Sequence, residues 1–195
     1  MLGTDARFGT CGGICPEAGA GSIVVASKGA GFITRNVDAF AYNYDGSSDA
    51  SSCAAEVKYR TSRVAPPCAE LSALVTARLV EALGAEVVVE GTNVTADSFY
   101  STQGRIDPNF DDANHSVVET IRAAYPDAKS LEMESFMLLH LAKCSKIPIS
   151  ATSATIVISN RLSSQCVDAE TLAFREHSGS KALLEALASF NMGDV

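Results

Sequence analysis

Short apolar runs alternate with helix-like segments along most of the 195 residues, and this alternation leaves few fold classes open. Apolar and β-branched runs predict buried strands at residues 22–27, 86–90, 129–133 and 149–159. Helices are predicted between Pro67 and Gly84, near 113–125, over 135–145, and over 168–190 with Asp168 as the N-cap. Strands that alternate with helices indicate an α/β fold with a largely parallel sheet, here as a single domain over residues 1–195.

Three segments do not fit this alternation. The low-complexity patch at residues 45–52 is typical of a surface loop, and the polar residues 91–112 form a connection long enough to suggest a functional loop. The glycine-rich stretch Gly9–Gly13 resembles a ligand loop where the founding strand of the sheet is expected. We therefore expect the first strand or strands of the fold to be missing.

Composition narrows the possible partners. The chain carries 23 acidic and 15 basic residues, a net charge of −8, which argues against nucleic acid because phosphate binding needs a basic face. No apolar run approaches the roughly 18 residues of a membrane span, and no signal-peptide pattern follows Met1. Six cysteines without a CxxC pair predict reduced thiols. We expect a cytoplasmic protein with neither a membrane nor a nucleic-acid partner.

The first candidate site combines Arg7 and Thr10 with the glycines from Gly9 to Gly13. Glycines let a backbone approach a ligand closely, and a guanidinium and a hydroxyl are donors suited to phosphate. The same residues are also consistent with a tight turn that has a solvated arginine beside it. From these residues alone an anion site and a plain turn remain equally open.

The second candidate site lies in the polar segment. Phe99 and Tyr100 are followed by Gln103, which offers donors and acceptors, and by Arg105, which offers donors only. An aromatic face beside an amide and a guanidinium suits a planar heterocycle with carbonyl and N–H edges. Alternatively, Phe99 anchors the loop to the core while Gln103 and Arg105 are solvated.

The third candidate site is Glu132-Met133-Glu134-Ser135, at a predicted strand-to-helix junction. Ligands of α/β folds bind outside the carboxyl ends of strands, and a carboxylate there can accept hydrogen bonds from a sugar diol. The alternative is that Glu134 and Ser135 simply occupy the first turn of the helix, where acidic residues favour the dipole.

The sequence offers no pattern for a metal or a covalent nucleophile. His115, His140 and His177 lack the spacing of metal ligands, and no serine or cysteine lies in a nucleophile-elbow motif. We therefore expect neither a metal site nor a catalytic triad.

Four short sequence motifs resemble, in their order and their residues, those of the nucleoside phosphorylase-I superfamily, and within it those of the uridine phosphorylases. They lie at residues 7–13, 97–105, 132–135 and 158–161. The resemblance implies a three-layer αβα sandwich around a mixed, largely parallel sheet. It also implies a chain that begins earlier than this one, and assembly as a homodimer or a higher homo-oligomer.

The resemblance implies roles for the first two candidate sites. Arg7 and Thr10 correspond to the residues that hold phosphate. Phe99 corresponds to the phenylalanine that packs on base and sugar. Gln103 and Arg105 correspond to the pair that reads the uracil edge, so Arg7, Gln103 and Arg105 are the expected catalytic residues.

For the third site the resemblance implies ribose binding by Glu132, Met133 and Glu134, with Glu134 the acceptor for the sugar hydroxyls. The implied reaction is reversible phosphorolysis of uridine to uracil and ribose 1-phosphate. It needs no organic cofactor, because orthophosphate is a co-substrate, and the partners are a small nucleoside and phosphate.

Two alternatives stay open. The chain could be a catalytically silent, truncated paralogue, or it could be a purine nucleoside phosphorylase or nucleosidase of the same superfamily. Purine-specific relatives use an acid after the late strand, whereas this sequence has Asn160 there, which favours a pyrimidine.

Overall fold

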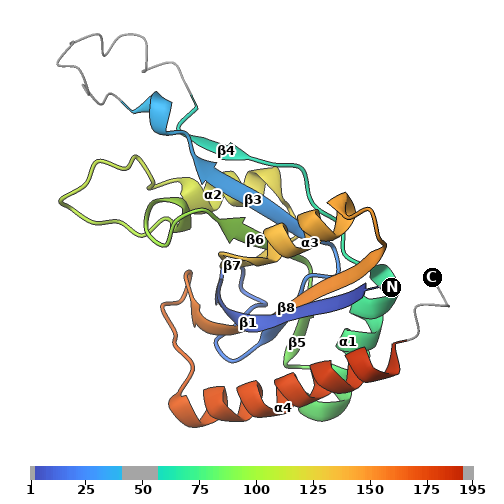
Figure 1. Cartoon of the computed structure of the whole chain (residues 1–195). Helices are drawn as coiled ribbons and strands as arrows, with labels where there is room; N and C mark the ends of the chain where they lie inside the picture. The colour runs from blue at the N-terminus through green and yellow to red at the C-terminus, as the bar shows by residue number, and fades with distance from the viewer. Residues whose placement is uncertain (1–2, 41–56, 191–195) are drawn as a thin grey trace.

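A computed structural model describes residues 3–40 and 57–190 as one eight-stranded sheet with helices on both faces (Figure 1). The sheet order is β4-β3-β6-β7-β1-β8-β2-β5. The strands are β1 (Gly3–Gly13), β2 (Ile23–Val25), β3 (Ala30–Arg35), β4 (Tyr59–Thr61), β5 (Val88–Glu90), β6 (Thr92–Ala96), β7 (Ala128–Glu132) and β8 (Ile149–Asn160). The helices are α1 (Ala69–Leu83), α2 (Val117–Ala124), α3 (Ser135–Cys144) and α4 (Ala169–Ser189), with short 3-10 turns η1 (Val37–Ala39) and η2 (Ser101–Gln103).

The sheet is mixed because three parallel groups meet in antiparallel fashion. Strands β3, β6 and β7 are parallel to one another, as are β1 and β8, and β2 and β5. Strand β1 meets β7 antiparallel only at its carboxyl end, where Gly12 pairs with Leu131 and Gly13 with Ser130. The carboxyl ends of β1, β7 and β8 therefore converge at one junction, the kind of place where α/β folds bind ligands.

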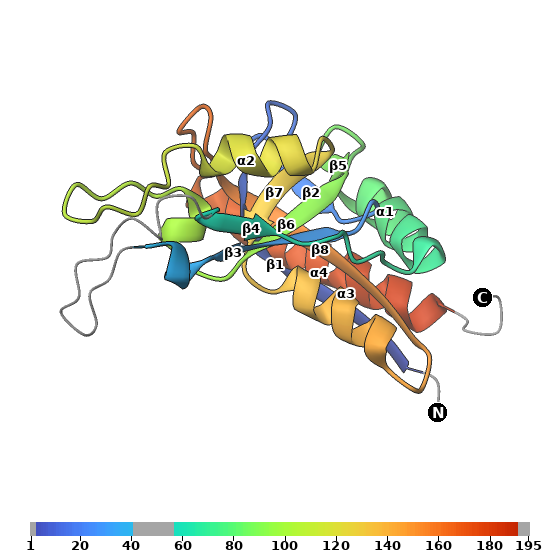
Figure 2. The ribbon, with the colours of Figure 1, turned by 90° about the horizontal axis from the view of Figure 1, so that it is seen from above.

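Side-chain alternation along the strands decides which helix covers which face. On β8, Ala154 and Ile156 pack against α1 and α4, whereas Ala151 faces α3. On β3, Phe32 packs with the α3 cluster and Ile33 with the α2 cluster. Helices α2 and α3 accordingly lie on opposite sides of the sheet (Figure 2), as the predicted three-layer αβα architecture requires.

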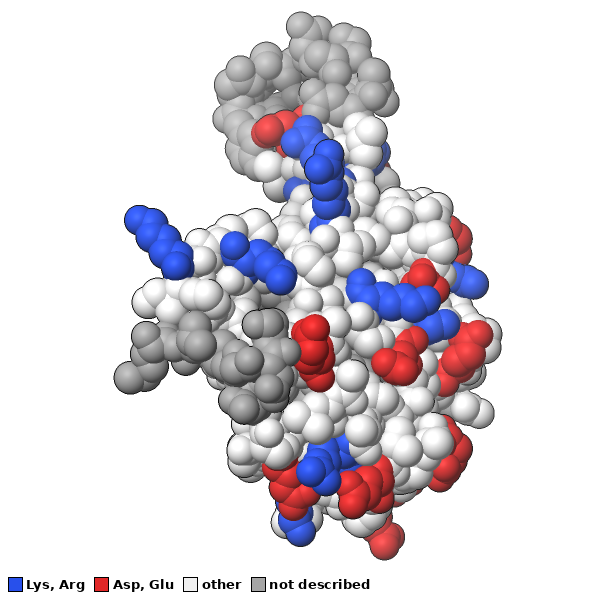
Figure 3. All heavy atoms as spheres, turned by 90° about the vertical axis from the view of Figure 1, so that its right-hand side faces the viewer, with Lys and Arg blue, Asp and Glu red and all other residues white. Residues whose placement is uncertain are grey.

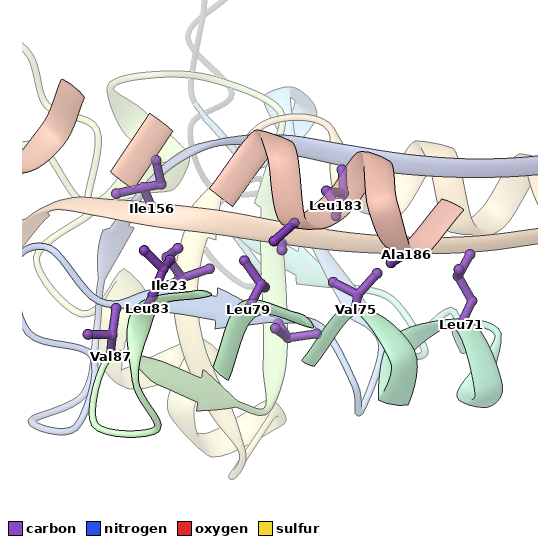
Figure 4. Packing of buried hydrophobic residues seen from close by; sticks show 12 residues of the cluster. Ile23, Leu71, Val75, Leu79, Leu83, Val87, Ile156, Leu183 and Ala186 are labelled. Atoms are coloured by element: carbon purple, nitrogen blue, oxygen red, sulfur yellow. The ribbon is translucent and has the colours of Figure 1, made fainter. Parts of the chain in front are cut away.

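The largest apolar cluster lies between the sheet and the pair α1 and α4 (Figure 4). Helix α1 contributes Leu71, Val75 and Leu79, all fully buried. The helix predicted between Pro67 and Gly84 is therefore confirmed, and Gly84, with φ of +93°, ends α1 as the sequence indicates. The Asp168 cap is also confirmed, since its carboxylate accepts from the Thr171 amide at 2.8 Å.

Two sequence-based predictions are wrong. The stretch Gly9–Gly13 is not a loop but the carboxyl end of β1, an interior strand of the sheet. Likewise, the segment 91–112 is not wholly irregular, because it begins with the buried strand β6. Strands β3 and β4 were not predicted either, and the patch at 45–52 lies outside the described residues.

The surface view in Figure 3 displays Lys and Arg side chains interspersed with Asp and Glu on one face, without a broad patch of either sign. Among the described helices, none combines the length and the apolar character needed to cross a membrane.

We expect the substitution Leu79→Ala to lower the free energy of unfolding by about 2–5 kcal/mol, because it leaves a cavity in the α1–α4 cluster. Leu184→Ala is the matched control, since Leu184 on α4 is 64% exposed, and it should change stability by less than about 0.5 kcal/mol. Urea unfolding of the three proteins measures both values. Equal losses for the two variants would contradict this packing.

Candidate functional site

A pocket of about 260 Å³ opens at the junction where the carboxyl ends of β1, β7 and β8 meet the segment after β6. Its lining residues come from four parts of the chain that are far apart in sequence. They are Arg7, Thr10, Cys11, Gly12, Phe99, Gln103, Arg105, Leu131, Glu132, Met133, Glu134, Ile158, Ser159 and Arg161. Three guanidinium groups and two carboxylates thus face one cavity in a protein of net charge −8.

The glycines of β1 give two arginine side chains room to lie against the strand. A Cβ atom at Gly9 would lie 2.9 Å from Nη2 of Arg7, and one at Gly12 would lie 2.9 Å from Nε of Arg161. Both approaches are closer than ordinary van der Waals contact. These glycines therefore do not form a turn; they lie in a strand and leave room for arginine side chains against its backbone.

Glu132, the last residue of β7, holds the centre of the site. Its carboxylate accepts the Thr95 hydroxyl at 2.6 Å, the Glu134 amide at 2.8 Å and the Ser135 amide at 3.0 Å. The Thr95 hydroxyl in turn accepts the Phe136 amide at 2.8 Å. These contacts satisfy the first amides of α3, which otherwise lack partners within the helix.

The same carboxylate fixes Arg7, whose Nη2 lies 3.3 Å from Glu132 Oε2 and also pairs with Glu134. The Glu132 side chain is only 2% exposed, whereas that of Glu134 is 60% exposed. The Glu132 carboxylate is thus buried and bonded to groups of the protein, whereas the Glu134 side chain reaches the open side of the pocket.

On the opposite wall, Arg105 stacks over the ring of Phe99, with its Cζ 4.0 Å from the ring centroid. Arg161 donates from Nη2 to Oε1 of Gln103 at 2.6 Å. Burial, and secondarily the nearby charge of Arg105, lowers the pKa of Arg161 from its ordinary value. In the described part of the chain, no carboxylate pairs with Arg105 or Arg161, so this wall offers positive charge to a ligand.

The comparison with family models decides the family, because the model of the phosphorylase superfamily matches residues 6–189. The chain belongs to the phosphorylase superfamily. A search of curated proteins finds no match to it.

Two solved structures are similar to this superfamily member. One, from work on two diverse uridine phosphorylases of the oomycete Phytophthora capsici, is 39% identical, with a TM-score of 0.88 over 97% of this chain. The other, a Trypanosoma brucei nucleoside phosphorylase that shows uridine phosphorylase activity, is 18% identical, with a TM-score of 0.70 over 96% of this chain, and supports the fold alone. The chain covers 66% and 64% of those two structures, respectively.

In this phosphorylase-superfamily chain, all eight residues expected to form the site line the one pocket. They are Arg7, Thr10, Phe99, Gln103, Arg105, Glu132, Met133 and Glu134. At the helix junction, Glu132 accepts the amides of Glu134 and Ser135 at the start of α3, while the more exposed side chain of Glu134 pairs with Arg7. The individual roles of these residues remain predictions.

The sequence argument missed Arg161 as a site residue. It stands directly after β8, where the carboxyl end of a strand is itself the indication of a ligand-facing position. Its neighbour Asn160 is not among the pocket residues. The Asn160 amide donates to Cys15 O and Ala18 O, both at 2.8 Å, and its oxygen accepts the Leu162 amide. Asn160 therefore braces the turn after β8.

No three His, Cys, Asp or Glu side chains group as metal ligands within residues 3–40 and 57–190. Cys11 lines the pocket but is buried, and this burial raises the pKa of its thiol to about 12. The thiol donates weakly to the Ile156 carbonyl at 3.5 Å. Cys11 is consequently an inert, neutral part of the pocket floor.

We expect iodoacetamide at about pH 8 to modify Cys144 and Cys166 in the native protein and to spare Cys11. The raised pKa keeps the Cys11 thiol protonated, and burial blocks the reagent. Peptide mass spectrometry measures each site, and the urea-unfolded protein, in which Cys11 must react, is the control. Fast modification of Cys11 in the folded protein would refute this account of the pocket floor.

Proposed function

We propose that this phosphorylase-superfamily chain carries the active site of a uridine phosphorylase, which converts uridine and orthophosphate to uracil and ribose 1-phosphate. The observation that carries the proposal is the wall formed by Phe99, Gln103, Arg105 and Arg161. Similarity to the Phytophthora capsici uridine phosphorylase structure supports it.

The hydrogen-bonding groups on this wall suit uracil. Because Gln103 accepts from Arg161 through Oε1, its amide nitrogen is left to donate toward a ligand. The two arginines are donors only, so together the three side chains favour a ring edge rich in carbonyl oxygens. Phe99 offers the aromatic face against which such a ring can stack.

The same wall favours bond cleavage. As the bond between the anomeric carbon and the base nitrogen breaks, the departing uracil takes the electron pair, and negative charge gathers on its carbonyl oxygens. Arg105 and Arg161, which no carboxylate of the described residues neutralises, stabilise that charge more than they stabilise neutral uridine. Donors that gain strength as charge develops lower the barrier.

The other side of the pocket suits sugar and phosphate. In this proposal Glu134, which lines the pocket, accepts hydrogen bonds from the ribose hydroxyls, and Thr10 and Arg7 donate to the attacking phosphate. A phosphate oxygen bonds to the anomeric carbon as uracil leaves, so no covalent link to the protein is required. Glu132 holds Arg7 in place for this step.

The first test is the substitution Arg105→Ala. We expect a loss of at least about 10²–10³-fold in kcat/KM for uridine, because one donor to the leaving base is removed. Phosphate binding, followed by calorimetry, should persist, since Arg7 and Thr10 are untouched. Arg122→Ala on α2 is the matched control, because Arg122 is exposed and does not line the pocket.

Substrate and phosphate dependence separate the alternatives. Uracil release that requires phosphate supports the proposal, whereas release without phosphate indicates a nucleosidase. Preference for inosine over uridine indicates a purine enzyme. If the folded protein cleaves none of these substrates, the silent-paralogue alternative is favoured. Unchanged uridine kinetics in the Arg105→Ala protein would refute the proposed base site.

The second test is Gly12→Ala. The new methyl group collides with Nε of Arg161, so the guanidinium has to move and its bond to Gln103 is lost. We expect the KM for uridine to rise about 10-fold while the KM for phosphate changes little. Gly19→Ala is the control, because the nearest atom to a Cβ there is 3.9 Å away. Steady-state kinetics with each substrate varied in turn measures both constants.

A further inference from the structure

The segment that carries Gln103 and Arg105 is held from behind by residues outside the pocket. It begins after β6 and runs from Asp97 to Asp112, and its two ends return to the same point on β3. That point is Arg35, the last residue of β3. The contacts between Arg35 and this segment could therefore set where Gln103 and Arg105 lie in the pocket.

Arg35 contacts the segment at three places. Its backbone amide donates to Asp97 Oδ2 at 3.0 Å, at the start of the segment. Its Nη1 donates to Ser101 Oγ at 3.1 Å, in the middle. The same nitrogen donates to Asp112 Oδ1 at 2.5 Å, at the far end.

Asp112 completes the arrangement. Its second carboxylate oxygen accepts the Ser101 hydroxyl at 2.7 Å, so both of its oxygens are used within the cluster. The carbonyl of Asp112 accepts the Tyr59 hydroxyl from β4 at 2.6 Å. Burial, followed by the charge of Asp112, raises the pKa of Tyr59 to about 12, which keeps that hydroxyl protonated as a donor.

The ion pair is well shielded, since the side chains of Arg35 and Asp112 are 19% and 17% exposed. The Arg35 guanidinium also stacks 3.8 Å above the ring of Phe40. A pair held by hydrogen bonds, stacking and burial is fixed in direction far better than a surface ion pair.

A short stretch of chain links the contacts of Arg35 and Asp112 to the pocket wall that carries Gln103 and Arg105. Ser101 opens the turn η2, which ends at Gln103. Gly104 follows with φ of +63°, and the amides of Gly104 and Arg105 donate to Ser101 O and Tyr100 O. A displacement of Ser101 therefore moves both base-reading side chains, although Arg35, Ser101 and Asp112 do not line the pocket.

We infer that Arg35 and Asp112 are positioning residues for base recognition, which set the placement of Gln103 and Arg105 through Ser101. This inference rests on the proposed function for its substrate, uridine. Arg35 acts on the base side of the site, and the phosphate side, built on β1, is independent of it. The expected signature is a defect in uridine use with phosphate use preserved.

The first experiment does not need activity. Hydrogen exchange is measured by mass spectrometry in the full chain for Arg35→Gln, for Asp112→Asn, which keeps the shape of the side chain, and for the control Arg122→Gln. We expect exchange about 10-fold faster over residues 98–106 in the first two proteins and unchanged exchange in α1. Unchanged exchange over 98–106, or acceleration throughout the chain, would overturn the inference.

The second experiment uses uridine phosphorolysis. We expect Arg35→Gln to lower kcat/KM for uridine about 10–100-fold with the KM for phosphate within about 2-fold of the wild type. In an Arg105→Ala background the same substitution should cause a smaller further loss, because only the part of its effect that passes through Gln103 remains. Arg35→Lys should restore part of the loss, since the charge remains while the fork is lost.

Losses that simply multiply in the double variant, or a matching rise in the KM for phosphate, would overturn the inference. Absence of uridine cleavage by the wild-type chain would instead contradict the proposed function. In that case the exchange measurement still decides whether Arg35 and Asp112 hold the segment, so the two failures are distinguishable.

Discussion

The buried carboxylate of Glu132 is the interaction on which the site depends. Its oxygens accept a hydroxyl from β6 and two amides at the start of α3, and they lie beside the guanidinium of Arg7 on β1. A charge this deeply buried is stable only when such partners surround it. The partners come from three elements, so the bonds of Glu132 also fix how β1, β6 and α3 meet. The pocket is the space that this fixed junction leaves open.

The need to seat arginines and polar groups explains why the interior around the site is unusually polar. Strand β6 buries Thr92, Asn93 and Thr95, and the latter two bond to side chains of β7. Strand β1 places glycines where arginine side chains lie against its backbone. Each of these choices weakens the apolar packing on one face of its strand, and the other face supplies that packing instead. Ala6 and Phe8 of β1 pack against the α1–α4 cluster, and Val94 and Ala96 of β6 belong to the α2 cluster. On β1 and β6, site chemistry and apolar packing thus lie mainly on opposite faces of the strand.

The same separation determines how far the sequence could be interpreted. The apolar pattern of the sequence located α1, α3, α4 and β8, because these elements pack against the core and their buried positions carry apolar side chains. Strand β6 was missed because its buried residues are mainly polar. The end of β1 was mistaken for a loop because glycines have no side chains and so show no strand-like alternation of apolar and polar residues. The site residues were singled out by their chemistry and spacing, and the resemblance to a family then supplied their expected roles. The partners of Arg35 were out of reach, since contacts between residues 35 and 112 depend on tertiary structure alone.

The two sides of the pocket differ in charge, and this difference favours one orientation of a bound ligand. Arg7 faces two glutamates, whereas Arg105 and Arg161 face none among the described residues. The ionisable groups of the cavity therefore carry a formal charge of −1 on the side of β1 and +2 on the side of η2. A ligand that starts neutral and becomes negative at one end is stabilised only when that end lies against η2. A nucleoside bound with its base on this wall meets that condition as the base departs. Partial burial of Arg161, which lowers its pKa, also reduces the screening of its charge by water, so this end of the pocket favours negative charge more strongly than an exposed arginine would.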